Sequence, residues 1–471
     1  MLKRTLSMVR SAGLRLIVLA GILCGVCIHR QALAHPEVPG EASKRPIAIL
    51  GATVHTVSDG VLEEATVLIR NGTIAAVGRD VKIPKRAVRI DAAGKHVAPG
   101  LFAANSDLGL VEINSVRATL DKNETGSITP NVKAWVSVNP DSEIIPVTRS
   151  NGVLLALTAP TGGLLAGQSA VLQLDGWTYE DLTLKPAVAM HVGWPAMAPV
   201  IDWETERSAK EQLADRDEAL GRLHDAFDDA RAYAKARAVD PTAPRDARWE
   251  AMQPVLSGEQ PLIIDADDLQ QIQAAVAFAV EQQVRIIIHG GYDAPLCAEL
   301  LKKHDVPVIV SEVYRLPLRR WEPYDNAYTV PARLHGAGVR FCISGGGRFG
   351  ASMLRNLPYH AAMAVAFGLP AEEALRSITL APAEILGVAD RVGTLEKGKD
   401  ATLIIADGDP LETATHVEAA FVQGRPVDLN DRHKRLWKKY EEKYRRLGLS
   451  GDAEGRPAQD RLPEDQAAAS R

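Results

Sequence analysis

Two polar side chains stand near the end of the apolar phrase "PGLFAANSDLGL", residues 99–110. Asn105 and Asp107 are two residues apart, so both point to the same face if this phrase is a β-strand. The Asp107 carboxylate is a competent ligand for a hard cation, whereas the neutral amide oxygen of Asn105 is a poor ligand for zinc. The pair indicates either a polar site at a strand end or structural side chains that bond to the backbone.

Two glycine-rich phrases, residues 161–170 and 344–350, could turn backbone N–H groups toward an anion. Neither has the spacing of a nucleotide-binding loop, so we expect tight turns. Ser169 and Ser344 lie within them, but no G-x-S-x-G elbow surrounds either serine. The sequence therefore assigns no catalytic residue.

The elements that position these residues form a repeating pattern from residue 99 onward. Continuous apolar runs such as "VLLALTA", "VRIIIHGG" and "VRFCISGGG" alternate with helical stretches. Such runs indicate parallel strands buried on both faces, and seven or eight of them favour a closed barrel over an open sheet. The sequence predicts an α/β fold with a (β/α)8 TIM-type barrel over residues 99–387, whose site lies at the C-terminal strand ends.

Both flanks of this region have β-like texture. Residues 46–98 are rich in β-branched side chains, and Asn71-Gly72 between two apolar runs predicts a hairpin. Residues 388–428 return to the same texture.

Three phrases carry a family resemblance: "KHVAPGLFAANSDLGL", "AGVRFCISGG" and "EEALRSITLAPAEILGVADRVGTLEKGKDATLIIADGDPL". With them the chain resembles the amidohydrolase superfamily, in particular its imidazolonepropionase-like and prolidase-like branch. The resemblance covers nearly the whole chain after residue 34. It implies that residues 46–98 and 388–428 form one composite β-domain, a small β-sandwich.

Members of this superfamily hydrolyse amide, cyclic amide or related bonds with one or two metal ions that lower the pKa of bound water. The resemblance places Asn105 and Asp107 at the two histidines of the first barrel strand. It places Asp265 at the fifth-strand histidine and His289 at the sixth-strand histidine. Asp107, Asp265 and His289 are thus the candidate metal ligands, with Asn105 doubtful, and they suit Mn²⁺, Mg²⁺ or Ca²⁺ better than zinc.

The same resemblance leaves two positions without a usual residue. Gly346 replaces the eighth-strand aspartate that serves as proton acceptor, and no fourth-strand ligand is identified, with His191 and Lys185 as loose candidates. Structural roles stay open for each residue; Asp265, for example, could begin a helix as its cap. No cofactor is certain, and a weakly held divalent metal is the one we retain.

Two functions of different classes follow. The first is hydrolysis of a peptide or non-peptide C–N bond by a remodelled metal site, acting on an unknown small molecule. The second is a catalytically inactive, secreted pseudoenzyme that keeps the scaffold to bind a ligand or partner.

Residues 1–34 resemble a secretory signal. Basic residues precede the apolar run Leu16–Ile28, and Ala32-Leu33-Ala34 supplies the small-residue cleavage pattern. A retained anchor is the alternative. We expect a periplasmic or secreted protein without stable membrane insertion after cleavage. Cys297 and Cys342 would then remain, and whether they form a bridge stays open.

Composition limits the partners. Residues 1–34 carry five positive charges and no negative ones, so their removal takes the net charge from −5 to −10. This charge argues against a polyanionic partner, and 5% aromatic residues argue against base stacking, so we expect no nucleic acid. A homo-oligomer remains open.

Two helical segments lie outside the barrel pattern. Residues 203–237 carry Leu213, Leu220, Leu223 and Phe227 at helical spacing, which favours a helix packed on the barrel over a partner-binding helix. Residues 429–471 predict a basic helix followed by a disordered tail. A solvated helix is favoured there over a membrane-surface helix, because Glu441 and Glu442 interrupt its positive charge.

Overall fold

The computed structural model of the protein describes residues 38–201 and 205–449. The expected signal peptide, residues 1–34, and the expected disordered tail from residue 450 onward lie outside the described residues. Within them, no helix has the length and apolar character needed to span a membrane. Cys297 and Cys342 are both buried and free.

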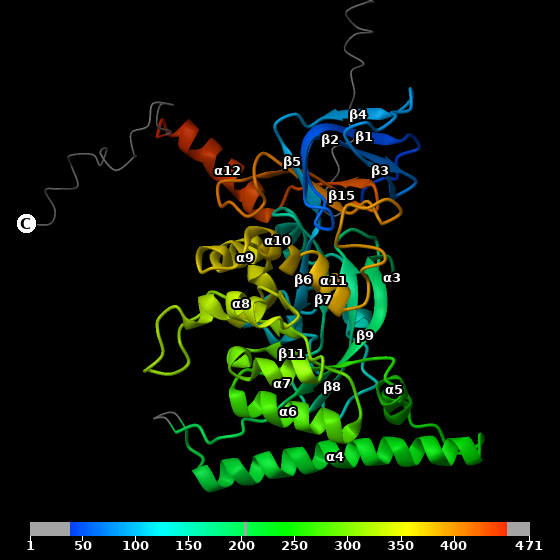
Figure 1. The fold of residues 1–471 in the computed structure, drawn as a ribbon, viewed down its shortest axis with the longest axis vertical. Coiled ribbons are helices and arrows are strands. Elements are labelled where there is room, and N and C mark those ends of the chain that lie inside the picture. The colour runs from blue at the N-terminus through cyan, green and yellow to red at the C-terminus, as the bar shows by residue number, and fades with distance from the viewer. Residues whose placement is uncertain (1–37, 202–204, 450–471) are drawn as a thin grey trace, which may run out of the picture. The chain divides into compact units, whose positions relative to one another are not determined.

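Strands from both flanks join in one eight-stranded sheet (Figure 1). Its order is β16-β15-β14-β5-β1-β2-β3, with β4 on β1. The pairing of β14 with β5 joins the two flanks, which confirms that both contribute to one β-domain. The strands are β1 Ile47–His55, β2 Val61–Arg70, β3 Thr73–Gly78, β4 Val88–Asp91, β5 His96–Pro99, β14 Leu403–Ala406, β15 Val417–Val422 and β16 Arg425–Val427.

The predicted hairpin at Asn71-Gly72 is confirmed. These two residues alone connect β2 to β3, which pair antiparallel. Both have a positive φ, 51° at Asn71 and 81° at Gly72. Two-residue turns need this left-handed backbone, and asparagine and glycine adopt it at the lowest cost.

The second sheet also has eight strands and nearly closes into a barrel (Figure 1). Its order is β13-β12-β11-β10-β9-β8-β7-β6. The strands are β6 Leu101–Ser106, β7 Val153–Thr158, β8 Leu165–Gln173, β9 Thr183–Gly193, β10 Leu262–Ala266, β11 Ile286–Gly290, β12 Val308–Val310 and β13 Phe341–Ile343. The TIM-type barrel is confirmed.

One feature of that prediction was wrong, because the strands are not all parallel. Strand β8 pairs antiparallel with both β7 and β9. Only residues 159–164 connect β7 to β8. A parallel pair needs a crossover of about a dozen residues, so this short connection requires a hairpin.

The barrel interior is filled with apolar side chains below the mouth. Strands β6 to β13 contribute Phe102, Leu157, Ile263, Ile287 and Ile309, among others, to one buried cluster. Asp265 and His289 are each two residues beyond Ile263 and Ile287, so they face the same interior, one layer nearer the C-terminal ends.

Helices cover the outside of the barrel. The longest, α4, buries Leu223, Ala226, Phe227 and Ala230, and its Phe227 ring packs 5.2 Å from Phe278 of α6 (Figure 1). The helix therefore packs on the barrel, as expected. The helices are α2 Ile144–Arg149, α3 Tyr179–Leu182, α4 Ala209–Val239, α5 Ala247–Leu256, α6 Leu269–Gln282, α7 Ala298–Lys303, α8 Asn326–Ala337, α9 Leu357–Ala366, α10 Ala371–Ser377, α11 Leu380–Ile385 and α12 Arg432–Arg446.

Candidate active site at the barrel mouth

A cavity of about 360 Å³ opens at the C-terminal ends of the barrel strands. Polar side chains dominate its lining: Asn105, Asp107, Lys122, Asp267, His289 and Arg315. Strands β6 and β11 supply Asn105 and His289, and the loops that follow β6, β10 and β12 supply the rest. The position is the one that barrel enzymes use for their sites.

Three of the predicted residues form a contact chain. His289 Nδ1 lies 2.6 Å from Asp265 Oδ1, and Asn105 Nδ2 lies 3.2 Å from His289 Nε2. The β10–β11 register pairs Asp265 directly with His289, which explains the first contact. When the carboxylate is ionised, Nδ1 carries the hydrogen and donates it to Asp265, so Nε2 keeps a lone pair.

The Asp265 carboxyl is held in its ionised form. Burial alone would raise the pKa of Asp265, but the hydrogen bond and charge of His289, aided by His191, outweigh it and leave the pKa below its usual value. Protein atoms surround the Asp265 carboxyl, but 59% of the Asp265 side-chain surface is exposed to solvent. An ionised carboxylate can thus orient the imidazole while water reaches the pair.

Asp107 has different partners. Its Oδ2 accepts a hydrogen bond from Lys122 Nζ at 3.1 Å, and its Oδ1 accepts one from the Ala351 backbone N–H at 2.8 Å. Gly350 lets the backbone approach, because a Cβ there would lie 2.7 Å from Asp107 Oδ1 and its φ is +54°. Both carboxylate oxygens are therefore already satisfied within the protein.

The three candidate ligands do not gather as a metal site. Asp265 and His289 contact each other, whereas Asp107 is held by Lys122 and Ala351. Throughout residues 38–201 and 205–449, no three His, Cys, Asp or Glu side chains are grouped so that they could hold a metal ion. In this arrangement the residues do not fit the metal that the fold family implies.

The remaining sequence candidates divide between the mouth and the far end of the barrel. Gly346 lines the cavity, and a Cβ there would lie 3.5 Å from the Asn105 carbonyl oxygen. His191 is buried one layer deeper, level with Ile263, and burial lowers the pKa of His191 to about 4. Lys185 was a wrong candidate: near the start of β9, its Nζ donates to the Gly387 carbonyl.

Neither serine from the glycine-rich phrases contacts a base. Ser344 Oγ donates to the Ser311 carbonyl at 2.9 Å, and Ser169 Oγ donates to the Ala189 carbonyl at 3.3 Å. Both hydroxyls therefore donate hydrogen bonds to backbone carbonyl oxygens.

Sequence reasoning missed two cations at the mouth. Lys122 follows β6 by a long loop, and Arg315 follows β12 and pairs with Asp267 at 2.8 Å. The Arg315 guanidinium also lies 5.0 Å from the centre of the Tyr292 ring. Each cation has a carboxylate partner, so the cavity is polar without a large net charge.

A larger hollow of about 770 Å³ adjoins this cavity and shares Glu312, Arg315 and Gly346 with it. Tyr314, Leu316 and other apolar side chains contribute to its lining. The site therefore has room for a ligand with one polar and one apolar part.

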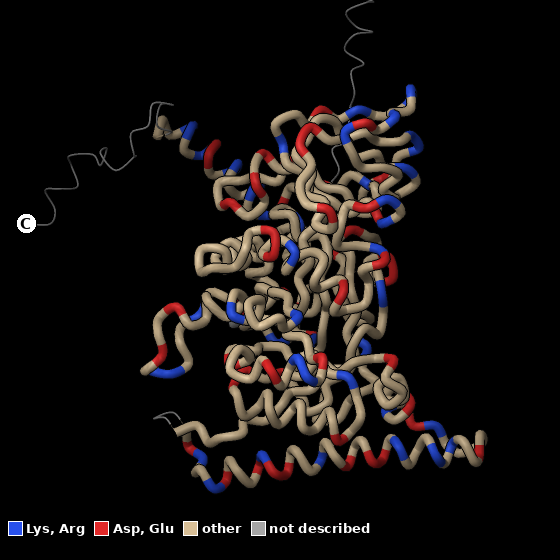
Figure 2. The backbone as a smooth tube through the Cα atoms, viewed as in Figure 1, with Lys and Arg blue, Asp and Glu red and all other residues tan. Residues whose placement is uncertain are grey.

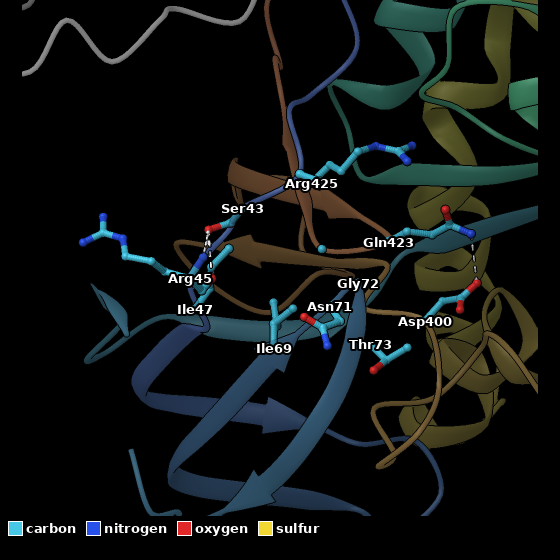
Figure 3. Close-up of a pocket in the computed structure, with 12 residues that line it drawn as sticks. Ser43, Arg45, Ile47, Ile69, Asn71, Gly72, Thr73, Asp400, Gln423 and Arg425 are labelled. Carbon is cyan, nitrogen blue, oxygen red and sulfur yellow. Dashed lines mark hydrogen bonds between the residues drawn. The ribbon is translucent and has the colours of Figure 1, made fainter. Parts of the chain in front are cut away.

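A separate hollow of about 360 Å³ lies on the composite sheet and contributes nothing to this site (Figure 3). Its polar groups are largely satisfied: Gln423 Nε2 donates to Asp400 at 3.3 Å, and Arg425 Nε donates to Asp175 at 3.2 Å. It lacks the mutually contacting acid and base that the barrel mouth has.

Acid should destabilise the protein through His360, which lines the larger hollow. This side chain is 6% exposed, and burial lowers the pKa of His360 to about 4, against 6.5 for an exposed histidine. Between these pH values the unfolded chain binds more protons, so stability rises with pH. We expect His360 to account for about 2 kcal/mol of the stability lost between pH 8 and pH 5.

Urea unfolding at both pH values measures this loss. The His360→Asn variant should lose that part of the pH dependence, whereas His416→Asn, at an exposed position, should retain it. Equal pH dependence in both variants would show that His360 does not titrate as expected.

Comparisons with known proteins agree with this architecture. A profile described as the Amidohydrolase family matches residues 324–429. Amidohydrolase tasK of Hapsidospora irregularis is 24% identical over 421 residues, which are 79% of this chain but 41% of that protein. The chain thus spans about two-fifths of that relative's length.

Two further similar proteins match over nearly their whole length. The imidazolonepropionase of Mesorhizobium japonicum is 24% identical over 419 residues, which cover 80% of this chain and 93% of that protein. An amidohydrolase structure from Thermotoga maritima superposes with a TM-score of 0.72 at 25% identity, covering 82% of this chain and all of that one. Together with the barrel and its mouth, these likenesses show that the chain belongs to the amidohydrolase superfamily.

Proposed function

We propose that this protein hydrolyses an amide or cyclic amide C–N bond at the barrel mouth, with His289 as the proton acceptor. One observation carries the proposal: His289 Nδ1 lies 2.6 Å from Asp265 beside the mouth cavity. A carboxylate that fixes the tautomer of a histidine leaves the other ring nitrogen free to act as a base. The names of the similar proteins, amidohydrolase and imidazolonepropionase, support this reaction class.

The residues present allow a balanced sequence of steps. His289 Nε2 removes a proton from water while the water oxygen bonds to the carbonyl carbon. As the C–N bond breaks, the same proton passes from Nε2 to the leaving nitrogen, which gives a carboxylic acid and an amine. The N–H groups of Asn105 and Lys122 border the cavity and can donate to the carbonyl oxygen, where negative charge develops.

The Asn105 amide must move before water can reach Nε2. Its nitrogen lies 3.2 Å from Nε2 and 3.4 Å from Nδ1, so it is not directed at Nε2 alone. A small rotation of the amide would admit water to Nε2 and direct Nδ2 toward a substrate.

A catalytically inactive ligand-binding protein is the second candidate. The Asp107 contacts favour it, since Lys122 and Ala351 occupy the carboxylate at a position where the family has a metal ligand. Asn105 Oδ1 is also buried without a hydrogen-bond partner among the described atoms, and a bound N–H group would satisfy it.

Incubation of the purified protein with a panel of N-acyl amino acids, dipeptides and cyclic amides separates the two candidates. Release of amine or ring-opened acid, followed by mass spectrometry, would support hydrolysis. Thermal stabilisation by a panel compound that is recovered unchanged would support the inactive binder.

We expect the purified protein to hold well under one zinc ion per chain after dialysis. A catalytic zinc site needs three good protein ligands oriented by further hydrogen bonds. At the matched positions this chain has one imidazole, two carboxylates, an amide and a glycine, and Asp107 does not join the other two. Elemental analysis measures the content. One tightly bound zinc ion that is lost in His289→Ala would overturn this expectation.

A further inference from the structure

Helix α12, Arg432–Arg446, makes few contacts with the rest of the molecule. None of its residues is buried. Its contacts lie in the first turn, where Arg435 pairs with Glu143 at 2.9 Å and His433 contacts Arg355. Asp431 caps the helix by accepting from the Lys434 N–H at 2.9 Å. The helix is thus attached at its start, and its remaining surface faces solvent.

Apolar side chains gather on one face of this helix. At 3.6 residues per turn they fall within an arc of about 100°. They include three aromatic rings with large accessible surfaces: Trp437 is 63%, Tyr440 47% and Tyr444 48% exposed. The aliphatic side chains Leu436 and Leu447 complete the arc and are 38% and 58% exposed. We call these five residues the aromatic face.

Positive charge covers the opposite face. The helix carries eight Lys and Arg residues against two Glu, in a chain whose net charge is −5, and Figure 2 shows the excess of basic residues along it. Glu442 is itself neutralised by Arg445 and Arg446, at 2.7 Å each. Lys439 and Lys443 border the aromatic face, with their Nζ atoms 5.7 and 5.8 Å from the centre of the Tyr440 ring.

We infer that α12 docks flat on an anionic lipid surface. A helix with Trp and Tyr on one side and Lys and Arg on the other places its rings at the headgroup boundary while its cations meet the lipid phosphates. Charge complementarity identifies the occupant. A second copy of α12 would bring two strongly positive helices together, and a nucleic acid would pair with the cations but leave the aromatic face in water.

Helix α4 differs from α12 both in its charge pattern and in the burial of its apolar side chains. That helix is also long and highly charged, but acidic and basic residues alternate along it (Figure 2). Its apolar side chains Leu223 and Phe227 are buried in the barrel core. Of these two helices, only α12 combines an exposed aromatic face with charge of predominantly one sign. The attachment is peripheral and does not depend on the reaction proposed for the barrel.

The test is co-sedimentation of the full chain with vesicles of phosphatidylcholine alone or with a third phosphatidylglycerol. We expect tighter binding to the anionic vesicles, weakened by salt. Lys438→Gln/Lys439→Gln should weaken it about 30-fold, because each basic residue near an anionic surface contributes about a fivefold affinity. Trp437→Ala/Tyr444→Ala should also weaken it without any change of charge.

The matched control is Lys210→Gln/Lys235→Gln on α4, which removes the same charge from exposed positions and should bind like the native chain. All variants share residues 1–34, so any contribution of that segment cancels. Equal binding by the α12 and α4 lysine variants would overturn the inference. A dimer in sedimentation velocity that Trp437→Ala/Tyr444→Ala abolishes would assign the face to a second copy and overturn it as well.

Discussion

The His289→Gln variant is expected to lower kcat/KM for the hydrolysed substrate by about 10²–10⁴-fold, the usual contribution of a positioned general base. Glutamine keeps a polar side chain of similar reach but cannot accept a proton at neutral pH. The loss should fall mainly on kcat, because the proton transfer occurs in the transition state. Steady-state kinetics on the compound identified by the hydrolysis panel measures both parameters.

The Asp265→Asn variant tests whether Asp265 positions His289. Asp265 accepts from His289 Nδ1 at 2.6 Å, and an asparagine amide could instead donate to Nδ1 and move the ring hydrogen to Nε2. We expect kcat to fall by about 10²-fold or more and the pH dependence of kcat to change, since the base is then in the wrong tautomer.

An exposed histidine provides the control for both variants. His416→Gln, at a position whose side chain is 81% exposed and lines neither hollow at the barrel mouth, should leave the kinetics unchanged. Full activity in His289→Gln would refute the proposed base. Absence of hydrolysis by the native protein, with ligand binding retained, would instead establish the inactive binder.

The family resemblance named the pair at the centre of this proposal, and its place at the barrel mouth agrees with how parallel strands end. "PLIIDA" and "VRIIIHGG" are apolar runs that each close on one polar residue, and neighbouring parallel strands bring such ends to one edge. The structure places Asp265 and His289 opposite each other in the β10–β11 register. Their identity followed from the resemblance to the amidohydrolase superfamily, and their approximate place agrees with the strand pattern, whereas their contact is set by the strand register.

The cations at the mouth could not be found in this way. Lys122 and Arg315 lie in long connections without hydrophobic periodicity, so nothing local predicts where their side chains end. The path of such a loop depends on contacts with distant segments, as when Ala351 and Lys122 meet at one carboxylate. For that carboxylate, Asp107, the sequence left a ligand role and a structural role open, because neither partner is adjacent to it in sequence.

The antiparallel strand β8 was missed for a related reason. The run "AVLQL" has the apolar texture of a buried strand, and that texture carries no direction. The short connection at residues 159–164 could have revealed the direction of β8. Its glycines were assigned to a tight turn, but a turn this short also requires the strands on either side to be antiparallel.

The largest expected effect on stability belongs to Asp175, which joins the barrel to the composite domain. Its carboxylate is 2% exposed and contacts Arg149 at 3.5 Å and Arg425, from β16, at 3.2 Å. Burial raises the pKa of Asp175 more than these two cations lower it, so the ionised group is costly to desolvate. Removing it in Asp175→Ala leaves the nearly buried Arg149 without this anion, and we expect a loss of about 3–5 kcal/mol.

Urea unfolding of Asp175→Ala beside Asp217→Ala measures the effect. Asp217 forms an exposed ion pair with Arg216 on α4, and loss of such a pair costs about 1 kcal/mol or less. If the charge of Arg149 causes the loss, the double variant Asp175→Ala/Arg149→Met should recover part of the stability, because the nearly buried cation is gone while its apolar stem is replaced. A loss in Asp175→Ala no larger than in Asp217→Ala would mean that water reaches Arg149 and that the pair is not the link between the domains.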